Sequence, residues 1–221
     1  VSTLDSALRV LLAQMGVGVE LAERLNAHVW ESSAANKFIT LVASELDPCD
    51  GSLKYVNAGH NDGLFVRSDG AVEHLGSAGA PIGMLPESAY RSQSVDFAPG
   101  DLVCFYSDGI TECEAPDEEE FEMERLTEVL RQNQKRPLEG IIAAIDRAVT
   151  DYRAGLPQGD DQTVILIRRF FMRLQLLTAS VVNLALGTVI RLLAKVRTRS
   201  VRRPTSSTVP SIEPISIQSP I

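Results

Sequence analysis

The segment GDDQTVILIRR, from Gly159 to Arg169, places two adjacent aspartates directly before an apolar run. The run from Thr163 to Ile167 is rich in β-branched residues and predicts a buried β-strand. Adjacent carboxylates repel each other, so a fold that keeps both ionised at a strand start needs a bound cation or full exposure to solvent. The alternative is a simple exposed turn, because Gly and Asp are common residues before strands.

A second acidic motif, YSDGITE from Tyr106 to Glu112, also comes at the end of an apolar run, Leu102 to Tyr106. An aspartate at a strand end can project its carboxylate beyond the sheet edge, and the glycine after it permits either a close backbone approach or a positive φ. The same Ser-Asp-Gly triplet recurs from Ser68 to Gly70. The triplet alone therefore does not separate a chemical role from a turn.

Charge is distributed unevenly along the 221 residues, of which 44% are hydrophobic and 23% charged. This composition is enough for one substantial core with an appendage. Residues 1–167 carry 12 basic and 28 acidic side chains, whereas residues 168–221 carry 9 basic and 1 acidic. Phosphate repulsion over so acidic a domain argues against nucleic-acid binding and favours a metal or a cationic partner.

The three cysteines, Cys49, Cys104 and Cys113, are odd in number and show no CxxC spacing. They indicate reduced thiols rather than a disulfide framework or a zinc site. The sequence also opens without a charged and then apolar leader of the secretory kind. Together these features predict a cytoplasmic protein.

The order of elements predicts an α+β fold with antiparallel sheets. Apolar residues at helical spacing predict helices over Leu4–Met15 and Glu20–Trp30. Four short runs then predict an antiparallel meander, and two more predict a hairpin: FITLVASELD, LKYVNAG, LFVRS and AVEHL, followed by YRSQSVDF and LVCFYS. Helices return over Phe121–Gln134 and Leu138–Tyr152 before the final strand at Thr163.

The amino-acid composition changes beyond Phe170. Leu174 to Ile190 lacks charge, and the basic stretch RLLAKVRTRSVRR follows it. We expect an apolar and basic tail helix over 170–203 and a disordered Ser/Pro-rich end over 204–221. Three interpretations remain open for the tail: a membrane-surface helix with a basic flank, a single-pass anchor, and a partner-binding or unfolded segment.

Five motifs together resemble one family. They occur in the order YVNAGHND (55–62), SAGAPIGML (77–85), FAPGDLVCFYSDGITE (97–112), FEMERL (121–126) and GDDQTVILIRR (159–169). This order resembles the PPM-type metal-dependent serine/threonine protein phosphatases, in their SpoIIE-like bacterial branch. The resemblance implies a phosphatase domain over 1–169, in which two antiparallel β-sheets form a sandwich with flanking helices and Mg²⁺ or Mn²⁺ ions lie at one end.

The resemblance also implies the site residues. Asp108 matches the family's central metal-binding aspartate, with Gly109 beside it, and Asp160 matches the aspartate of the closing motif, with Asp161 as second choice. Asp108 and Asp160 would then act in catalysis through a metal-activated water, and the cation would offset the repulsion noted above. His60 also matches the family pattern, and we expect it to hydrogen-bond its own loop rather than act in catalysis.

One family motif has no match. The Gly-Gly-Asp motif of the first metal-binding hairpin does not occur in Val1–Trp30. We therefore expect the first strands to be missing, Phe38–Asp47 to have an unpaired edge, and the chain to hold one ion at most and turn over slowly.

Three functions remain open on this basis. The first is a phosphatase acting on a phosphorylated regulatory protein of the anti-sigma-factor antagonist type. The second is a catalytically inactive module that binds a partner-switching phosphoprotein or an anti-sigma-type kinase. The third is a membrane-tethered scaffold in which the C-terminal tail, through a contact with the membrane surface, matters most.

Overall fold

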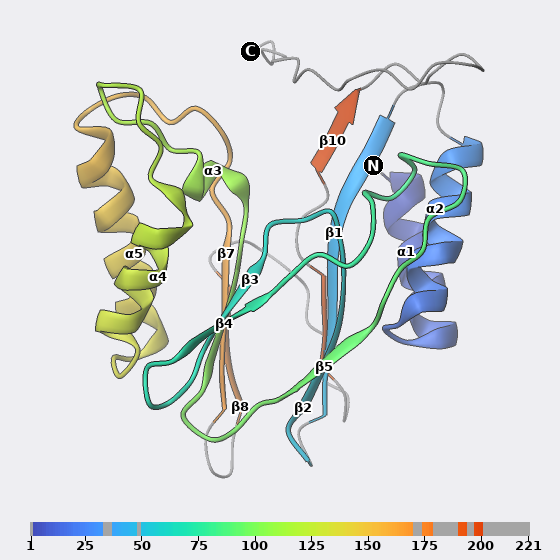
Figure 1. Ribbon diagram of the computed structural model, residues 1–221, viewed down its shortest axis with the longest axis horizontal. Helices are drawn as coiled ribbons and strands as arrows, with labels where there is room; N and C mark the ends of the chain where they lie inside the picture. Colours follow the sequence, from blue (N-terminus) through green and yellow to red (C-terminus); the bar gives the residue numbers. More distant parts are fainter. Residues whose placement is uncertain are drawn as a thin grey trace.

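The computed structural model describes residues 2–32, 37–47, 50–169, 174–178, 190–193 and 197–200. Two antiparallel β-sheets pack face to face, and helices cover both outer faces (Figure 1). The first sheet contains β1 (Lys37–Leu46), β2 (Ser52–Ala58), β5 (Gln93–Asp96), β9 (Ile190–Leu193) and β10 (Arg197–Ser200). The second contains β3 (Gly63–Val66), β4 (Val72–Leu75), β6 (Leu102–Tyr106), β7 (Val164–Arg169) and β8 (Leu174–Thr178). The predicted sandwich is thereby confirmed.

The helices lie where the sequence predicts them. Helices α1 (Ser2–Met15) and α2 (Val19–Ser32) cover the first sheet, and α4 (Glu122–Asn133) and α5 (Leu138–Arg153) cover the second (Figure 1). Residues Leu21, Leu25 and Val29 of α2 are spaced four apart, so they share one face and pack with Ile39 and Leu41 of β1. A short helix, α3 (Asp108–Thr111), follows β6 and was not predicted.

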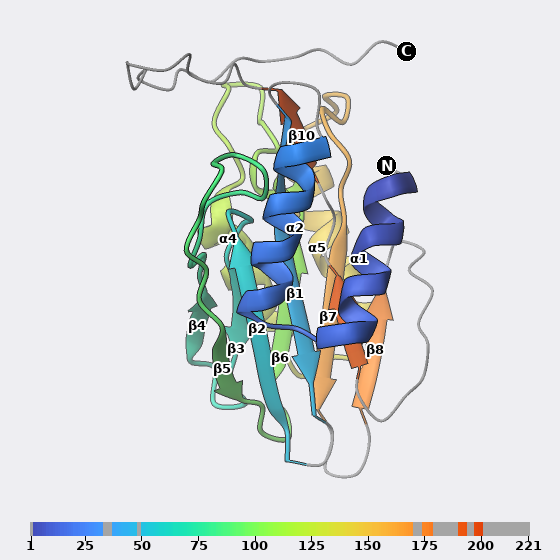
Figure 2. The same cartoon turned by 90° about the vertical axis from the view of Figure 1, so that its right-hand side faces the viewer.

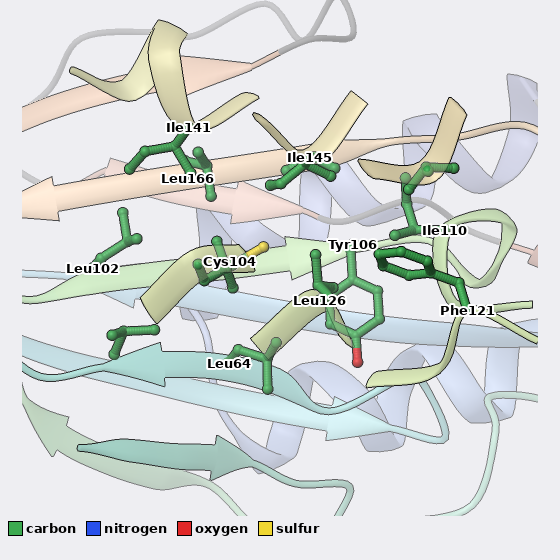
Figure 3. Packing of buried hydrophobic residues seen from close by; sticks show 14 of the residues in the cluster. Leu64, Leu102, Cys104, Tyr106, Ile110, Phe121, Leu126, Ile141, Ile145 and Leu166 are labelled. Atoms are coloured by element: carbon green, nitrogen blue, oxygen red, sulfur yellow. The ribbon is translucent and has the colours of Figure 1, made fainter. Parts of the chain in front are cut away.

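The central strands are apolar throughout because both of their faces are covered. In β6, Leu102, Cys104 and Tyr106 pack beneath α4 and α5, as Figure 3 shows. The alternate residues Val103 and Phe105 pack between the two sheets. Strand β7 alternates in the same way, so the two strands that carry the acidic motifs are fixed on both sides.

Between β1 and β7, the chain changes sheets after β2, after β4 and after β5, and at the first and last of these points the predicted pairings are wrong. Strand β3 does not continue a meander from β2, and β5 pairs with β2 rather than forming a hairpin with β6. A buried carboxylate, that of Asp101, holds the crossover from β5 to β6. It accepts backbone hydrogen bonds from Ala98 and Ser68, both 2.9 Å long, and pairs with Arg67 at 3.1 Å.

The tail contributes strands where a helix was predicted. Strand β8 pairs with β7, while β9 and β10 pair with β1. Two predictions are therefore wrong: the helix over 170–203 at these three stretches, and the unpaired edge of Phe38–Asp47. The physical reason is that open strand edges leave backbone donors and acceptors unpaired, and an added strand satisfies them.

The structure does not test the remaining predictions for the tail. The remainder of the tail, including the predicted disordered end from Pro204 to Ile221, lies outside the described residues, as does Cys49. Among the helices that the structure describes, none has the length and apolar character to cross a membrane.

Candidate metal and phosphate site

The two acidic motifs meet at one end of the sandwich. Strands β6 and β7 are antiparallel neighbours with Tyr106 opposite Val164, so the end of β6 lies beside the start of β7. Asp108 follows β6, and Asp160 and Asp161 precede β7. Figure 1 shows α3 next to the segment that enters β7. Motifs separated by about fifty positions in the sequence thus form one acidic end of the second sheet.

Hydrogen bonds join these two turns into one unit, which we call the paired acidic turns (residues 107–109 and 160–163). The Ser107 hydroxyl donates to the Asp161 carbonyl at 2.8 Å and accepts from the Thr163 amide at 2.9 Å. The Gln162 side chain donates to the Gly109 carbonyl at 3.0 Å. Sequence reasoning missed Ser107 and Gln162, although each is a polar residue directly beside a singled-out aspartate.

Gly109 is required at this point for space. A Cβ at this position would lie 2.6 Å from the carbonyl oxygen of Asp161 and 3.2 Å from that of Asp160. Both contacts are with backbone, which cannot turn aside as a flexible side chain can. Of the two roles that the sequence allowed for this glycine, the close backbone approach is the one found.

The carboxylates of the paired acidic turns are oriented by their own backbone. Asp108 is half-buried and accepts a bond from the Gly109 amide at 3.0 Å, while the exposed Asp160 accepts from the Asp161 amide at 2.7 Å. Carboxylate oxygens are the ligand type that Mg²⁺ and Mn²⁺ prefer. Within the described residues, however, no three His, Cys, Asp or Glu side chains form a group arranged for a metal ion. The donors fit such an ion in kind and fall short of a complete site in number.

Another carboxylate, that of Asp62, lies at the same end. Strand β3 starts beside the end of β6, with Leu64 opposite Cys104, which places Asp62 next to Tyr106. Burial is the main cause that raises the pKa of Tyr106, and the charge of Asp62 adds to it. The Asp62 carboxylate accepts from the Ser77 amide at 3.2 Å and lies 3.8 Å from the His74 ring. It is thus engaged with the neighbouring loop.

The His60 backbone bonds within its own loop, as expected, whereas its ring contacts strand β1. Its ring Nδ1 lies 3.4 Å from the Thr40 hydroxyl, and its backbone amide donates to the Asn57 side chain at 2.9 Å. Burial lowers the pKa of His60 to about 4. The ring is therefore neutral at pH 7, which suits a packed hydrogen-bonding group better than a general acid.

Comparison with known proteins agrees with this geometry. The family model of stage II sporulation protein E (SpoIIE) matches residues 1–170. Protein IcfG of Synechocystis sp. is 34% identical over 132 residues, which cover 60% of this chain and 21% of IcfG. Phosphoserine phosphatase RsbP of Bacillus subtilis is 23% identical over 156 residues, covering 71% of this chain and 37% of RsbP. The chain thus spans well under half the length of either relative.

Solved structures share the fold. The SiaA-PP2C domain of Pseudomonas aeruginosa superimposes with a TM-score of 0.64 at 19% identity, covering 75% of this chain and 67% of that one. The phosphatase domain of SpoIIE from Bacillus subtilis, presoaked with Mn, gives a TM-score of 0.54 at 20% identity, covering 76% and 74%. Both similarities concern the arrangement of the two sheets and their helices.

Proposed function

The chain belongs to the SpoIIE family, and from this membership we propose that it is a metal-dependent phosphatase that hydrolyses phosphoserine or phosphothreonine on a regulatory protein. The observation that supports the proposal best is the contact between the paired acidic turns. Ser107 and Gln162 hold these turns together, so that Asp108, Asp160 and Asp161 share one end of the sandwich. A concentration of carboxylates at a solvent-facing edge attracts divalent cations.

The proposed role of each residue follows from the oxygen atoms that it offers to a metal ion. Asp108 and Asp160, with Asp161 as second choice, would hold Mn²⁺ or Mg²⁺, and the Gly109 carbonyl is a further oxygen donor. A bound ion of this kind lowers the pKa of a ligand water and neutralises phosphate oxygens. The chain's own contribution is to fix the spacing of the carboxylates, which the Ser107 hydroxyl and the absence of a side chain at Gly109 achieve.

The proposed partner is a phosphorylated regulatory protein of the anti-sigma-factor antagonist type. RsbP, one of the relatives above, is named a phosphoserine phosphatase, which supports a phosphoserine substrate. The net charge of −8 supports a protein partner over a nucleic acid.

An activity assay tests the proposal. The full chain should release phosphate from a phosphoserine protein in millimolar Mn²⁺, and chelation with EDTA should abolish the release. Asp108→Ala should remove the activity, whereas Asp69→Ala, in the other Ser-Asp-Gly triplet, should leave it unchanged. Activity that survives both EDTA and Asp108→Ala would refute a metal-dependent reaction at this site.

A second function has one observation in its favour. The described residues contain no group of three potential ligands arranged for a metal ion, as an inactive relative would also show. Such a protein would bind a phosphoprotein or an anti-sigma-type kinase without hydrolysing it. Tight binding of the phosphoprotein without turnover, even in millimolar Mn²⁺, would favour this binding module over the enzyme.

We also propose a cytoplasmic location at the membrane surface, on the basis of charge. Residues 168–221 carry 9 basic side chains and 1 acidic one, which would attract anionic lipid headgroups. The full chain should sediment with anionic vesicles at low salt, remain in solution with neutral vesicles, and dissociate at high salt because the attraction is screened. A full chain that stays in the supernatant with anionic vesicles at low salt would contradict this contact.

A further inference from the structure

The two halves of β1 have different neighbours. Its second half, from Leu41 to Leu46, pairs with β2. Its first half, from Lys37 to Thr40, pairs with β10 on one edge, as Figure 2 shows at the upper end of β1. On the other edge Ile39 forms a bridge to Ile82, with N–O distances of 2.9 and 2.8 Å. The first half of β1 therefore depends on β10 for its only ladder of several residues within the described structure.

This half of β1 also holds the loops at the site end of the sandwich. The Thr40 hydroxyl contacts the His60 ring, and the next residue, Leu41, bridges to Gly59. The loop of Ile82 packs on Gly59 so closely that a Cβ there would lie 2.5 Å from the Pro81 ring. The loops at 59–60 and 81–82 are thus positioned through the start of β1.

We propose that β10 supports the loops at the site end of the sandwich, and that its removal loosens the start of β1 and, with it, these loops. A short stretch left with one bridge opens locally at low free-energy cost, while the rest of the domain stays folded. The C-terminal segment would then control the order of the loops at the site end, a regulatory role that rests on the proposed function.

The pairing geometry identifies the amides that matter. In an antiparallel pair, successive residues direct their backbone groups to opposite edges. Because Ile39 bonds to Ile82, its neighbours Phe38 and Thr40 direct theirs toward β10, where Arg199 and Arg197 stand opposite. The Thr198 amide, by the same alternation, points away from β1. A proline at 199 therefore removes a pairing donor, and a proline at 198 on this edge strand does not.

Hydrogen exchange measured by mass spectrometry on the full chain tests the proposal. Arg199→Pro should speed exchange about threefold to tenfold in peptides covering 37–42 and 81–84, as expected for the loss of one net hydrogen bond. Peptides from β6 should be unaffected. Two control variants should keep exchange in these peptides close to the wild-type rate. They are Arg199→Gln, which removes the charge and keeps the amide, and Thr198→Pro.

A truncation pair makes the test independent of proline effects. A chain ending at Leu193 lacks β10, whereas a chain ending at Ser200 keeps it. Faster exchange at 37–42 and 81–84 in the first chain only is the expected result. Unchanged exchange there, or an equal rise in β6, would overturn the proposal. This readout needs no catalysis. A failed phosphatase assay on the wild type would therefore reject the proposed function, whereas the exchange data alone decide whether β10 supports these loops.

Discussion

Two Ser-Asp-Gly triplets lie at opposite ends of the second sheet and have different structures. In Ser68–Gly70 the Asp69 carboxylate accepts from the Ala71 amide at 2.9 Å, and Gly70 has a φ of +94°. In Ser107–Gly109 the serine hydroxyl bonds across the sheet end to the Asp161 carbonyl, and the glycine packs against that same carbonyl. The first triplet closes a hairpin, whereas the second docks one turn on another.

The difference shows what converts a common turn into a candidate site. Each glycine is needed, but Gly70 is needed for its backbone angle and Gly109 for its lack of a side chain. The triplet of the candidate site is distinguished by a second acidic turn that β7 brings against it. At the other end of the sheet, the acidic group is Asp101, which is buried and paired with Arg67, so it stabilises the fold.

The largest expected effect separates the two glycines by activity. Gly109→Ala should lower metal-dependent phosphate release about a hundredfold, because pushing the 160–161 backbone aside misplaces the carboxylates on the scale of an ångström. Gly70→Ala should lower stability by about 1 kcal/mol, from the left-handed angle, and leave turnover intact. Phosphate-release rates for both variants at matched folded fractions make the comparison. Equal losses would mean that the two turns do not differ in function.

The next effect separates the two ends by stability. Asp101→Ala should reduce the free energy of unfolding by about 3 kcal/mol, since it leaves two amides without their acceptor and removes the buried carboxylate that pairs with Arg67. Asp160→Ala, at an exposed turn, should change it by less than about 0.5 kcal/mol. Urea denaturation measures both values. A large loss for Asp160→Ala would show that the paired acidic turns serve the fold more than a site.

Acid should lower the stability of the folded chain through protonation of His60, at the site end of the sandwich. Its pKa is lowered to about 4 in the folded chain, so the unfolded chain binds the extra proton first as the pH falls. Stability that is complete above pH 6.5 should therefore decline toward pH 4, by up to about 2 kcal/mol after allowance for the partial exposure of the ring. Thermal unfolding of wild type and His60→Gln across this range measures the decline. An identical slope in both proteins would exclude His60 as its source.

The smallest effect compares the two serines. Ser107→Ala removes a donor to Asp161 and an acceptor for Thr163 and should cost about 1–2 kcal/mol. Ser68 bonds to Asp101 through its backbone amide, so Ser68→Ala should stay within about 0.5 kcal/mol of the wild type. Urea denaturation again gives the two values. Equal losses of stability in the two variants would show that the Ser107 hydroxyl does not link the paired acidic turns.

The sequence predicts the elements of this fold better than their partners. The continuous apolar run of β6 and the helical spacing in α2 are local signals, and both elements formed as predicted. The crossover between β5 and β6 depends on Asp101 reaching Ser68, 33 positions away, which no local pattern encodes. The pairing of β9 and β10 likewise depends on the open edge of β1, so the tail was predicted as a helix.

For the candidate site, too, the sequence identifies the residues but not their arrangement. Asp108 and Asp160 were singled out from their motifs, and they remain predictions as metal ligands. Their arrangement depends on the bond from Ser107 to Asp161, which spans 54 positions and is visible only in three dimensions. A motif thus identifies candidate donors, whereas long-range hydrogen bonds decide whether two motifs share one site.

A calorimetric titration with Mn²⁺ tests the central claim most directly, namely that the paired acidic turns bind a divalent cation and the Ser68–Gly70 turn does not. The wild type and Asp69→Asn should give the same binding heat and the same metal-dependent rise in melting temperature. The Asp108→Asn, Asp160→Asn double variant should lose both, because it removes the charges that the cation requires. Indistinguishable heats from the wild type and the double variant would contradict the claim.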